Sequence, residues 1–364
     1  MSVRWMERRV FLTAGAWECL AAESDARYTA EARYYEKLPH NKVKCALCPR
    51  ECVVDDRERG YCGVRENRSG KYYTLVYSRV VSLNADPIEK KPLFHYAPGS
   101  LAFSIATAGC NVNCKMCQNW EISQVRPEQV PSQHLPPRQA AQMARRTGSK
   151  VIAYTYTEPV IFYEYMADTA EAARKEGVKS CVVTNGYIRA EPLRDLCARV
   201  DAIKVDLKAY SEKFYREVVR GELKPVLETL AAIRKTPVWL EIVYLVTPTL
   251  NDSDGELQGL ARWVKKELGA DVPVHFSRFH PQYLLKNLPP TPVKTLERAR
   301  AIALSEGLHY AYVGNVPGHP GEHTYCPGCG KTVVERTGFR VRAVRLKKGR
   351  CEACGRPVAG VWEV

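Results

Sequence analysis

The chain has 364 residues, enough to bury a full core, either as one large α/β domain with small appendages or as two ordinary domains. A hydrophobic content of 45% is that of a globular protein, which excludes a disordered or fibrous chain. No run of about 20 apolar residues occurs, so we expect no transmembrane helix. The net charge of +14 suits a basic surface or a polyanionic partner, but no RNA-binding motif supports a nucleic-acid partner.

Fourteen cysteines are the most informative part of the composition. Eleven fall into three tight groups, and only Cys19, Cys181 and Cys197 stand alone. Disulfide frameworks are typical of small secreted chains, so clustered thiols in a chain of this size indicate bound metal and a cytoplasmic location. The three isolated cysteines are interpreted as ordinary buried residues.

The first segment, residues 1 to about 40, is predicted to be helical. Within it, Met6–Leu12 resembles a twin-arginine export signal, but Glu18, Glu23 and Asp25 interrupt the apolar stretch that such a signal needs. We therefore expect an N-terminal helix rather than an export signal.

A cysteine-rich module follows, with the spacing C-x2-C-x3-C-x9-C at Cys45, Cys48, Cys52 and Cys62. Four thiolates in so short a segment indicate a metal site, and they suit zinc or a second [4Fe–4S] cluster equally well. A cluster here would relay electrons to another one. Residues 71–83 then have the composition of strands, and residues 86–100, rich in proline and lysine, are predicted to be a linker.

From residue 101 the chain alternates between apolar strand-like runs and helical stretches. Strands are predicted at residues 101–108, 151–157, 180–185, 202–208, 238–246 and 274–279, with a weaker one at 309–313. Helices are predicted at residues 138–146, 160–175, 191–198, 212–219, 222–234, 252–268 and 294–305. This alternation predicts parallel strands with helical crossovers. The expected fold class is α/β, a partial (β/α)6 TIM-type barrel, with an open doubly wound sheet as the alternative.

After Pro317 the chain changes character, and two Cys-x2-Cys pairs flank a basic, β-rich segment. The pairs are Cys326 with Cys329 and Cys351 with Cys354, and their spacing predicts a structural zinc ribbon. The expected domains are therefore residues 1–100, helical and cysteine-rich, residues 101–316, the barrel core, and residues 317–364, the zinc ribbon.

The central cysteines, Cys110, Cys114 and Cys117, have the spacing C-x3-C-x2-C directly after the first strand of the barrel pattern. Thiolates this close in a loop can hold an iron–sulfur cluster, and three of them leave one iron open for a substrate or cofactor. Zinc fits less well, because it usually takes four ligands. The loop also lies at the carboxyl end of a strand, where barrels carry their chemistry.

This motif resembles that of the radical S-adenosylmethionine (SAM) superfamily. More narrowly, the chain is similar to glycyl-radical-enzyme activases such as pyruvate formate-lyase activating enzyme, and most to the radical SAM enzyme of the AmmeMemoRadiSam system. Residues 86–93, 117–123 and 314–318 carry this further resemblance. It implies that the cluster reductively cleaves SAM to a 5′-deoxyadenosyl radical, which abstracts hydrogen from an unidentified substrate.

The resemblance also implies SAM-binding residues in this chain. Tyr156, Thr157 and Glu158 stand where the family has a Gly-Gly-Glu stretch, so the glutamate matches and the glycines do not. Asn185 matches the ribose-side turn, His280 an adenosine-side histidine, and Met116 a position that is usually aromatic. Asp206 and Lys208 match an acid–base pair near the SAM carboxylate or the substrate, although a plain salt bridge explains them nearly as well.

Two other functions compete with this interpretation. A glycyl-radical activase is disfavoured because typical activases lack a C-terminal ribbon. A metal-stapled module that binds RNA or protein is disfavoured because a scaffold has no use for an open iron. The resemblance further implies an electron donor such as ferredoxin or flavodoxin, and AMMECR-type and MEMO-type partner proteins.

Overall fold

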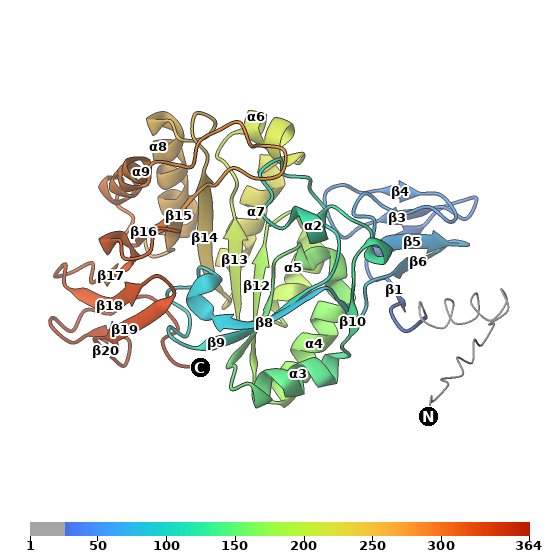
Figure 1. Ribbon diagram of the computed structural model, residues 1–364, viewed down its shortest axis with the longest axis horizontal. Helices are drawn as coiled ribbons and strands as arrows, with labels where there is room; N and C mark the ends of the chain where they lie inside the picture. Colours follow the sequence, from blue (N-terminus) through green and yellow to red (C-terminus); the bar gives the residue numbers. More distant parts are fainter. Residues whose placement is uncertain (1–25) are drawn as a thin grey trace, which may run out of the picture.

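The computed structural model describes residues 26–364, so the twin-arginine-like segment and Cys19 lie outside the described residues. Its centre is an eight-stranded sheet with the order β16-β15-β14-β13-β12-β11-β9-β8 (Figure 1). The strands are β8 (Ser82–Pro87), β9 (Leu101–Ala106), β11 (Val151–Tyr154), β12 (Lys179–Thr184), β13 (Ala202–Asp206), β14 (Trp239–Val246), β15 (Val274–Arg278) and β16 (Ala311–Gly314). All neighbours from β9 to β16 pair in parallel, and β8 pairs antiparallel to β9.

The strand order confirms the predicted parallel α/β sheet. Each parallel strand lies beside the next one in the chain, so the order never reverses. A doubly wound sheet reverses its order at a switch point, and that alternative is therefore wrong. The edge strands β8 and β16 do not pair with each other in the part of the chain that the structure describes. Strand β8 precedes residue 100, so the N-terminal domain predicted over residues 1–100 supplies one edge of the main sheet.

Helices connect the parallel strands as predicted. They are α3 (Pro137–Arg146), α4 (Tyr163–Lys175), α5 (Ala190–Cys197), α6 (Glu212–Phe214), α7 (Leu223–Arg234), α8 (Asp254–Trp263) and α9 (Val293–Ser305). Short helical turns are η1 (Ile88–Lys90), α2 (Trp120–Ser123), η2 (Pro127–Gln129), η3 (Pro159–Phe162), η4 (Tyr215–Val219), η5 (Val264–Leu268) and η6 (Pro320–Glu322). Because right-handed connections between successive strands all pass on one side, these helices cover one face of the sheet.

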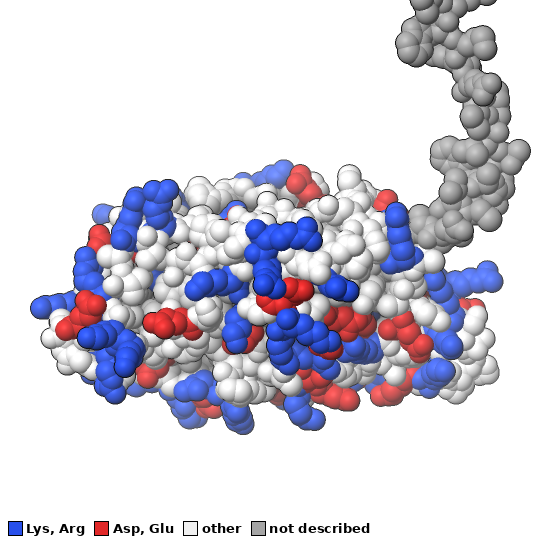
Figure 2. Space-filling view, turned by 90° about the horizontal axis from the view of Figure 1, so that it is seen from below, with Lys and Arg blue, Asp and Glu red and all other residues white. Residues whose placement is uncertain are grey.

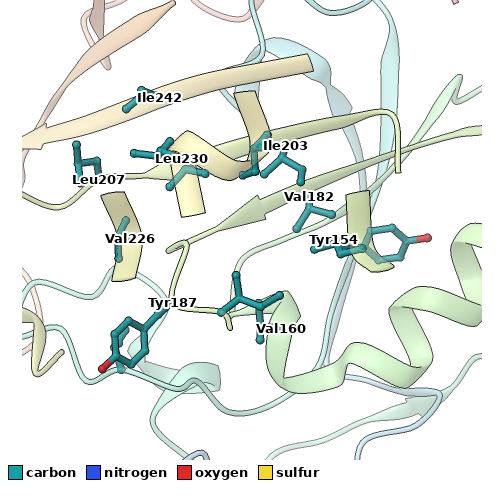
Figure 3. Close-up of a cluster of buried hydrophobic side chains, with 14 of the residues drawn as sticks. Tyr154, Val160, Val182, Tyr187, Ile203, Leu207, Val226, Leu230 and Ile242 are labelled. Carbon is teal, nitrogen blue, oxygen red and sulfur yellow. The ribbon is translucent and has the colours of Figure 1, made fainter. Parts of the chain in front are cut away.

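The main core lies between the sheet and its helices. Side chains alternate along a strand, so every second residue of β12, β13 and β14 points toward the helices. Figure 3 shows Val182, Ile203 and Ile242 on this side, with Val226 and Leu230 of α7 packed among them. All five are fully buried.

The opposite face of the sheet is closed at the amino ends of the strands. Leu93 and Tyr96 pack there against Ala102, Val151 and neighbouring small residues. The end of the chain joins them, since Ala97 N donates to Val361 O at 2.7 Å and Val361 N donates to His95 O at 2.7 Å. The linker predicted over residues 86–100 is thus wrong, because its apolar side chains are buried under the sheet.

The N-terminal module is built from short antiparallel strands on the right of Figure 1. They are β1 (Ala30–Glu31), β2 (Tyr35–Lys37), β3 (Val43–Cys45), β4 (Val53–Val54), β5 (Arg65–Arg68), β6 (Lys71–Thr74) and β7 (Arg79–Val80). A later strand, β10 (Gln133–His134), pairs antiparallel with β7. The helix predicted to about residue 40 is therefore wrong for residues 27–40, which form turns and short strands. Aromatic residues favour strands, and here Tyr35 packs its ring on Tyr72 while Tyr34 donates to Asp195 at 2.9 Å.

The C-terminal segment forms β17 (Thr324–Tyr325), β18 (Thr332–Thr337), β19 (Arg340–Val344), β20 (Leu346–Lys347) and β21 (Arg350–Cys351). Buried Arg336 ties this segment to residues 86–100 by donating to Phe94 O at 2.6 Å, and it also donates to Thr324 Oγ1 within the segment at 2.8 Å. No helix among residues 26–364 is long and apolar enough to cross a membrane. Figure 2 shows acidic side chains interspersed among the basic ones on the face that it presents.

Candidate active site and metal centres

A cavity of about 410 Å³ opens at the carboxyl ends of the parallel strands. Loops after β9, β11, β12 and β13 form most of its wall, and the upper parts of β14 and β15 complete it. The sequence-predicted residues that line it are Cys110, Cys114, Met116, Cys117, Tyr156, Thr157, Glu158, Asn185, Asp206 and Lys208. Residues from four separate predicted segments thus meet at one place.

The three central cysteines lie on the loop after β9. Cys117 Sγ lies 3.2 Å from Ser123 Oγ, and Asn185 Nδ2 lies 3.9 Å from Cys110 Sγ. Burial raises the pKa of Cys114 to about 12 and also raises the pKa of Cys110, so both remain thiols at neutral pH until a metal displaces the proton. Among the described residues lining the cavity there is no histidine and no fourth cysteine. This donor set fits an iron–sulfur cluster with one open iron.

The end of β11 is held by its own polar side chains. Thr157 Oγ1 donates to Thr107 O at 2.8 Å, and Tyr156 adopts the left-handed φ of 65° that turns the chain. Glu158 accepts from Thr184 Oγ1 at 2.6 Å, Asn185 N at 2.8 Å and Val160 N at 3.1 Å. Burial raises the pKa of Glu158 to about 7, although these hydrogen bonds oppose the change.

Asn185 connects the turn after β12 to the cysteine loop. Its Nδ2 donates to Asn111 Oδ1 at 2.8 Å, and Asn111 Nδ2 donates to Tyr187 O at 2.8 Å. Asn111, the residue after Cys110, is therefore held in place by hydrogen bonds to the turn that follows β12. A molecule bound at the cysteines would lie against Asn185, which lines the same cavity.

Asp206 lies between two lysines at the top of β13. Its carboxylate contacts Lys208 Nζ at 3.0 Å and also Lys204 Nζ. Burial alone would raise the pKa of Asp206, but the two ammonium charges lower it to about 2, so it is ionised at neutral pH. Burial lowers the pKa of Lys204, and the Asp206 charge raises the pKa of Lys208 against the effect of burial. The predicted pair is therefore a triad with one excess positive charge.

The remaining two predicted SAM contacts lie in different places. Met116 is buried and lines the cavity. His280 follows β15, is exposed, and does not line the cavity. The structure does not bring it together with the other candidate residues.

Several cavity residues were missed in the sequence. Lys90, Lys91, Lys204, Ser277, Asn315 and Phe339 all line the cavity. Lys204 carried a usable signal, because a lysine inside a buried strand, two residues before Asp206, must share its face. Lys90, Lys91 and Asn315 lie in residues 86–93 and 314–318, which carry the family resemblance but were not assigned to the site. Ser277 and Phe339 come from a strand and a hairpin that no local pattern relates to the cysteines.

Comparison with known proteins identifies the family. Residues 104–261 match the family model of the radical SAM superfamily. The uncharacterized protein MJ0808 of Methanocaldococcus jannaschii is 46% identical over 330 residues, which cover 90% of this chain and 98% of that protein. The chain belongs to the radical SAM superfamily.

Other similarities are weaker. Pyruvate formate-lyase 1-activating enzyme of Escherichia coli K12 is 24% identical over 218 residues, which cover 53% of this chain and 85% of that enzyme. A solved domain of the pyruvate-formate lyase-activating enzyme from Bacteroides vulgatus has a TM-score of 0.39 and 14% identity, covering 45% of this chain and 98% of that chain. As a radical SAM protein, the chain is an enzyme that uses SAM, and the family implies a [4Fe–4S] cluster.

In this radical SAM chain, the N-terminal cysteine group lies beside the loop that carries Cys110, Cys114 and Cys117. Cys45, Cys48, Cys52 and Cys62 line one narrow cavity in the N-terminal module. They come from β3 and the loops around β4, which fold back on themselves at Gly60. All four thiols thus face a common space, as their spacing predicts.

The third cysteine group has the geometry of a single-ion site. The Sγ atoms of Cys326, Cys329, Cys351 and Cys354 all lie within 4.8 Å of one another. Zn–S bonds of about 2.3 Å hold two sulfurs no more than about 4.6 Å apart, so a small contraction around one metal ion suffices. The two histidines nearest in sequence are engaged elsewhere and are not needed as ligands. His319 contacts Glu297, and His323 accepts from the backbone N–H of Arg336.

Proposed function

We propose that Cys110, Cys114 and Cys117 hold a [4Fe–4S] cluster whose open iron binds SAM, and that the substrate enters the same cavity. When bound, the cluster and SAM supply a 5′-deoxyadenosyl radical that abstracts hydrogen from the substrate. The observation that carries this proposal is the cavity, in which three thiols gather without a fourth cysteine or a histidine among the described lining residues.

The chain's own residues bind and orient. Lys204 and Lys208 give the cavity wall a net positive charge next to ionised Asp206, which suits a carboxylate such as that of SAM. Glu158 has hydrogen-bond acceptors left over, which suits an ammonium group. Met116 supplies an apolar surface for a base. We keep His280 as a SAM contact on the resemblance alone, because it does not line the cavity.

The proposal is tested by anaerobic reconstitution, reduction with dithionite and addition of SAM. We expect 5′-deoxyadenosine from the native protein and from Cys197→Ala, which removes an isolated thiol on α5. Cys114→Ala should give no product. The proposal would be contradicted if a protein with a confirmed cluster formed no product and its paramagnetic signal did not change when SAM was added.

A second candidate is a glycyl-radical activase, which acts on the backbone of another protein. The similarity to the E. coli activating enzyme favours it. Formation of a protein-borne glycyl radical on a partner would distinguish it from action on a small molecule. For either function we propose ferredoxin or flavodoxin as the donor, and AMMECR-type and MEMO-type proteins as partners.

We also propose the finer architecture as a working division. Residues 101–316 form a partial barrel around the cavity, residues 1–100 form the N-terminal region, and residues 317–364 form a zinc ribbon with a structural role. The four clustered sulfurs of the last segment support zinc there.

A further inference from the structure

The N-terminal cysteine cavity is organised like a metal site. Its four cysteines, Cys45, Cys48, Cys52 and Cys62, line one common space. Cys52 Sγ accepts from Tyr61 N at 3.5 Å. A backbone N–H that donates to a sulfur also suits the thiolate form, which is what a bound metal requires.

The spacing of these sulfurs favours a cluster over a single ion. Among the described residues, only the C-terminal cysteines bring three or more ligand atoms within 4.8 Å of one another. The N-terminal four line one cavity but are more widely spaced, as are the three radical SAM cysteines. Zinc would need its sulfurs within about 4.6 Å, whereas a cubane binds each thiolate at a different iron and so holds them further apart.

A buried hydroxyl points to the same occupant. Tyr72 lines this cavity, is fully buried, and its Oη has no hydrogen-bond partner in the described structure. A Cβ built on Gly60 would stand 2.5 Å from Tyr72 Oη and 3.8 Å from Cys52 Sγ, so the hydroxyl lies beside the cysteines. A buried donor without an acceptor costs stability, and the sulfides of a cluster would supply the acceptor.

The cavity also touches the radical SAM loop. A Cβ on Gly109 would stand 2.9 Å from Cys62 O and 2.6 Å from Val64, which explains why this position, at φ 97°, is glycine. Cys110 is the next residue, about 3.8 Å further along the chain. Asn111 lines the N-terminal cavity, and its carbonyl accepts from Arg50 Nε at 2.7 Å.

We propose that Cys45, Cys48, Cys52 and Cys62 hold a second [4Fe–4S] cluster that passes electrons to the radical SAM centre; the relay role rests on the proposed function. One electron from a low-potential protein donor, such as flavodoxin or ferredoxin, reduces the N-terminal cluster from the 2+ to the 1+ state. That cluster returns to 2+ when it reduces the radical SAM cluster by one electron. No iron of the N-terminal cluster is left open, because all four have a cysteine ligand.

The first test removes the radical SAM cluster. The variant Cys110→Ala/Cys114→Ala/Cys117→Ala is reconstituted anaerobically, and its iron and zinc are counted. We expect about four irons per chain and a paramagnetic signal on reduction that SAM does not change, against about eight irons in the native protein. Zinc in place of this iron, at about one ion per chain beyond the C-terminal site, would overturn the cluster assignment. This result does not depend on SAM cleavage.

The second test keeps every cysteine. Tyr72→Phe removes the hydroxyl that we expect to donate to the cluster, which should lower the reduction potential of the N-terminal cluster without loss of iron. Tyr96→Phe is the matched control, since Tyr96 Oη is also buried and unpartnered in the described structure but lies under the sheet. An unchanged potential in Tyr72→Phe, or an equal change in both variants, would contradict the proposed contact.

The third test addresses the relay. In Cys48→Ala/Cys62→Ala, we compare 5′-deoxyadenosine formation driven by reduced flavodoxin with that driven by dithionite, a small reductant that reaches the cavity directly. We expect the flavodoxin-driven rate to fall at least tenfold more than the dithionite-driven rate. An equal fall in both would overturn the relay while leaving the radical SAM proposal intact.

Discussion

At the scale of single residues, a buried histidine illustrates how the sheet's underside is held. His95 Nδ1 donates to Ala359 O at 2.6 Å, and His95 Nε2 accepts from Tyr312. Its neighbour Glu241 accepts from His275 Nε2 at 2.7 Å. Burial lowers the pKa of His95 to about 4, with Arg336 and His275 adding repulsion and Glu241 opposing it; Tyr310 and Tyr312 complete its surroundings.

This pKa predicts how stability depends on pH. Between about pH 6.5 and 4 the unfolded chain binds the His95 proton and the folded chain does not, so stability falls as pH falls. The loss from this one group is about 2 kcal/mol between pH 7 and pH 5. His95→Gln should shrink the difference between urea unfolding free energies at these two pH values. An undiminished difference would assign the effect to other groups, of which His275, whose pKa burial also lowers, is the first.

The sequence predicted the residues that carry their own chemistry and missed those that depend on distant contacts. The spacing of Cys110, Cys114 and Cys117 is local, and so is the position of Glu158 at a strand end. Phe339 reaches the cavity from a hairpin more than 200 residues after the cysteine loop, and Ser277 reaches it from β15. No period or spacing relates such residues, because only the folded chain makes them neighbours.

At the scale of elements, one buried ion pair joins the N-terminal module to the main sheet's helices. Arg65 of β5 contacts Glu164 of α4 at 2.6 Å, and both side chains are almost fully buried. Glu164 also accepts from Arg33 N at 2.7 Å. This pair fixes the module that carries the N-terminal cysteines against α4, the helix that connects β11 to β12.

Breaking this pair should be costly because it leaves a buried charge. Arg65→Met should lower the unfolding free energy by about 3–5 kcal/mol, and adding Glu164→Gln should recover part of the loss. Urea unfolding of the metal-loaded protein measures both. Arg262→Met, which breaks an exposed pair with Glu306, should cost at most about 1 kcal/mol. Equal losses for the two arginines would show that the buried pair has no special weight.

The elements themselves followed from simple patterns where burial was regular. Strands buried on both faces gave continuous apolar runs, and the helices between them gave the 3.6-residue period. The pattern failed at residues 30–40 and 86–100. There, aromatic residues such as Tyr35 and Tyr96 pack on partners far away in the chain, and local composition gives no sign of them.

At the scale of the whole molecule, the C-terminal segment both seals the sheet and reaches the cavity. Cys326 and Cys351 pack with Phe94 and Tyr310, and the hairpin tip places Phe339 at the cavity wall. The Arg336 guanidinium lies 4.2 Å from the centre of the Phe94 ring. Metal at the four C-terminal cysteines would therefore hold β18, the strand that carries Arg336, in position against Phe94.

Removing one of these ligands should act on stability. Cys354→Ser should lower the zinc content by about one ion per chain and lower the thermal midpoint by several degrees, since metal binding contributes folding free energy. The iron content and the cluster absorbance should remain. Loss of SAM cleavage in a protein that keeps its fold would instead give the ribbon a part in the reaction.

The pairing of Val361 with the segment around Tyr96 has a consequence for synthesis on the ribosome. Residues 95–97 emerge early, but their partner is made only after the whole parallel sheet has been translated. At ordinary elongation speeds this delay is on the order of tens of seconds. During that interval the cysteines at positions 45–62 and 110–117 are already outside the ribosome, while the underside of the sheet has not yet closed. The nascent chain thus exposes these two groups of thiols before the contact between Val361 and residues 95–97 exists.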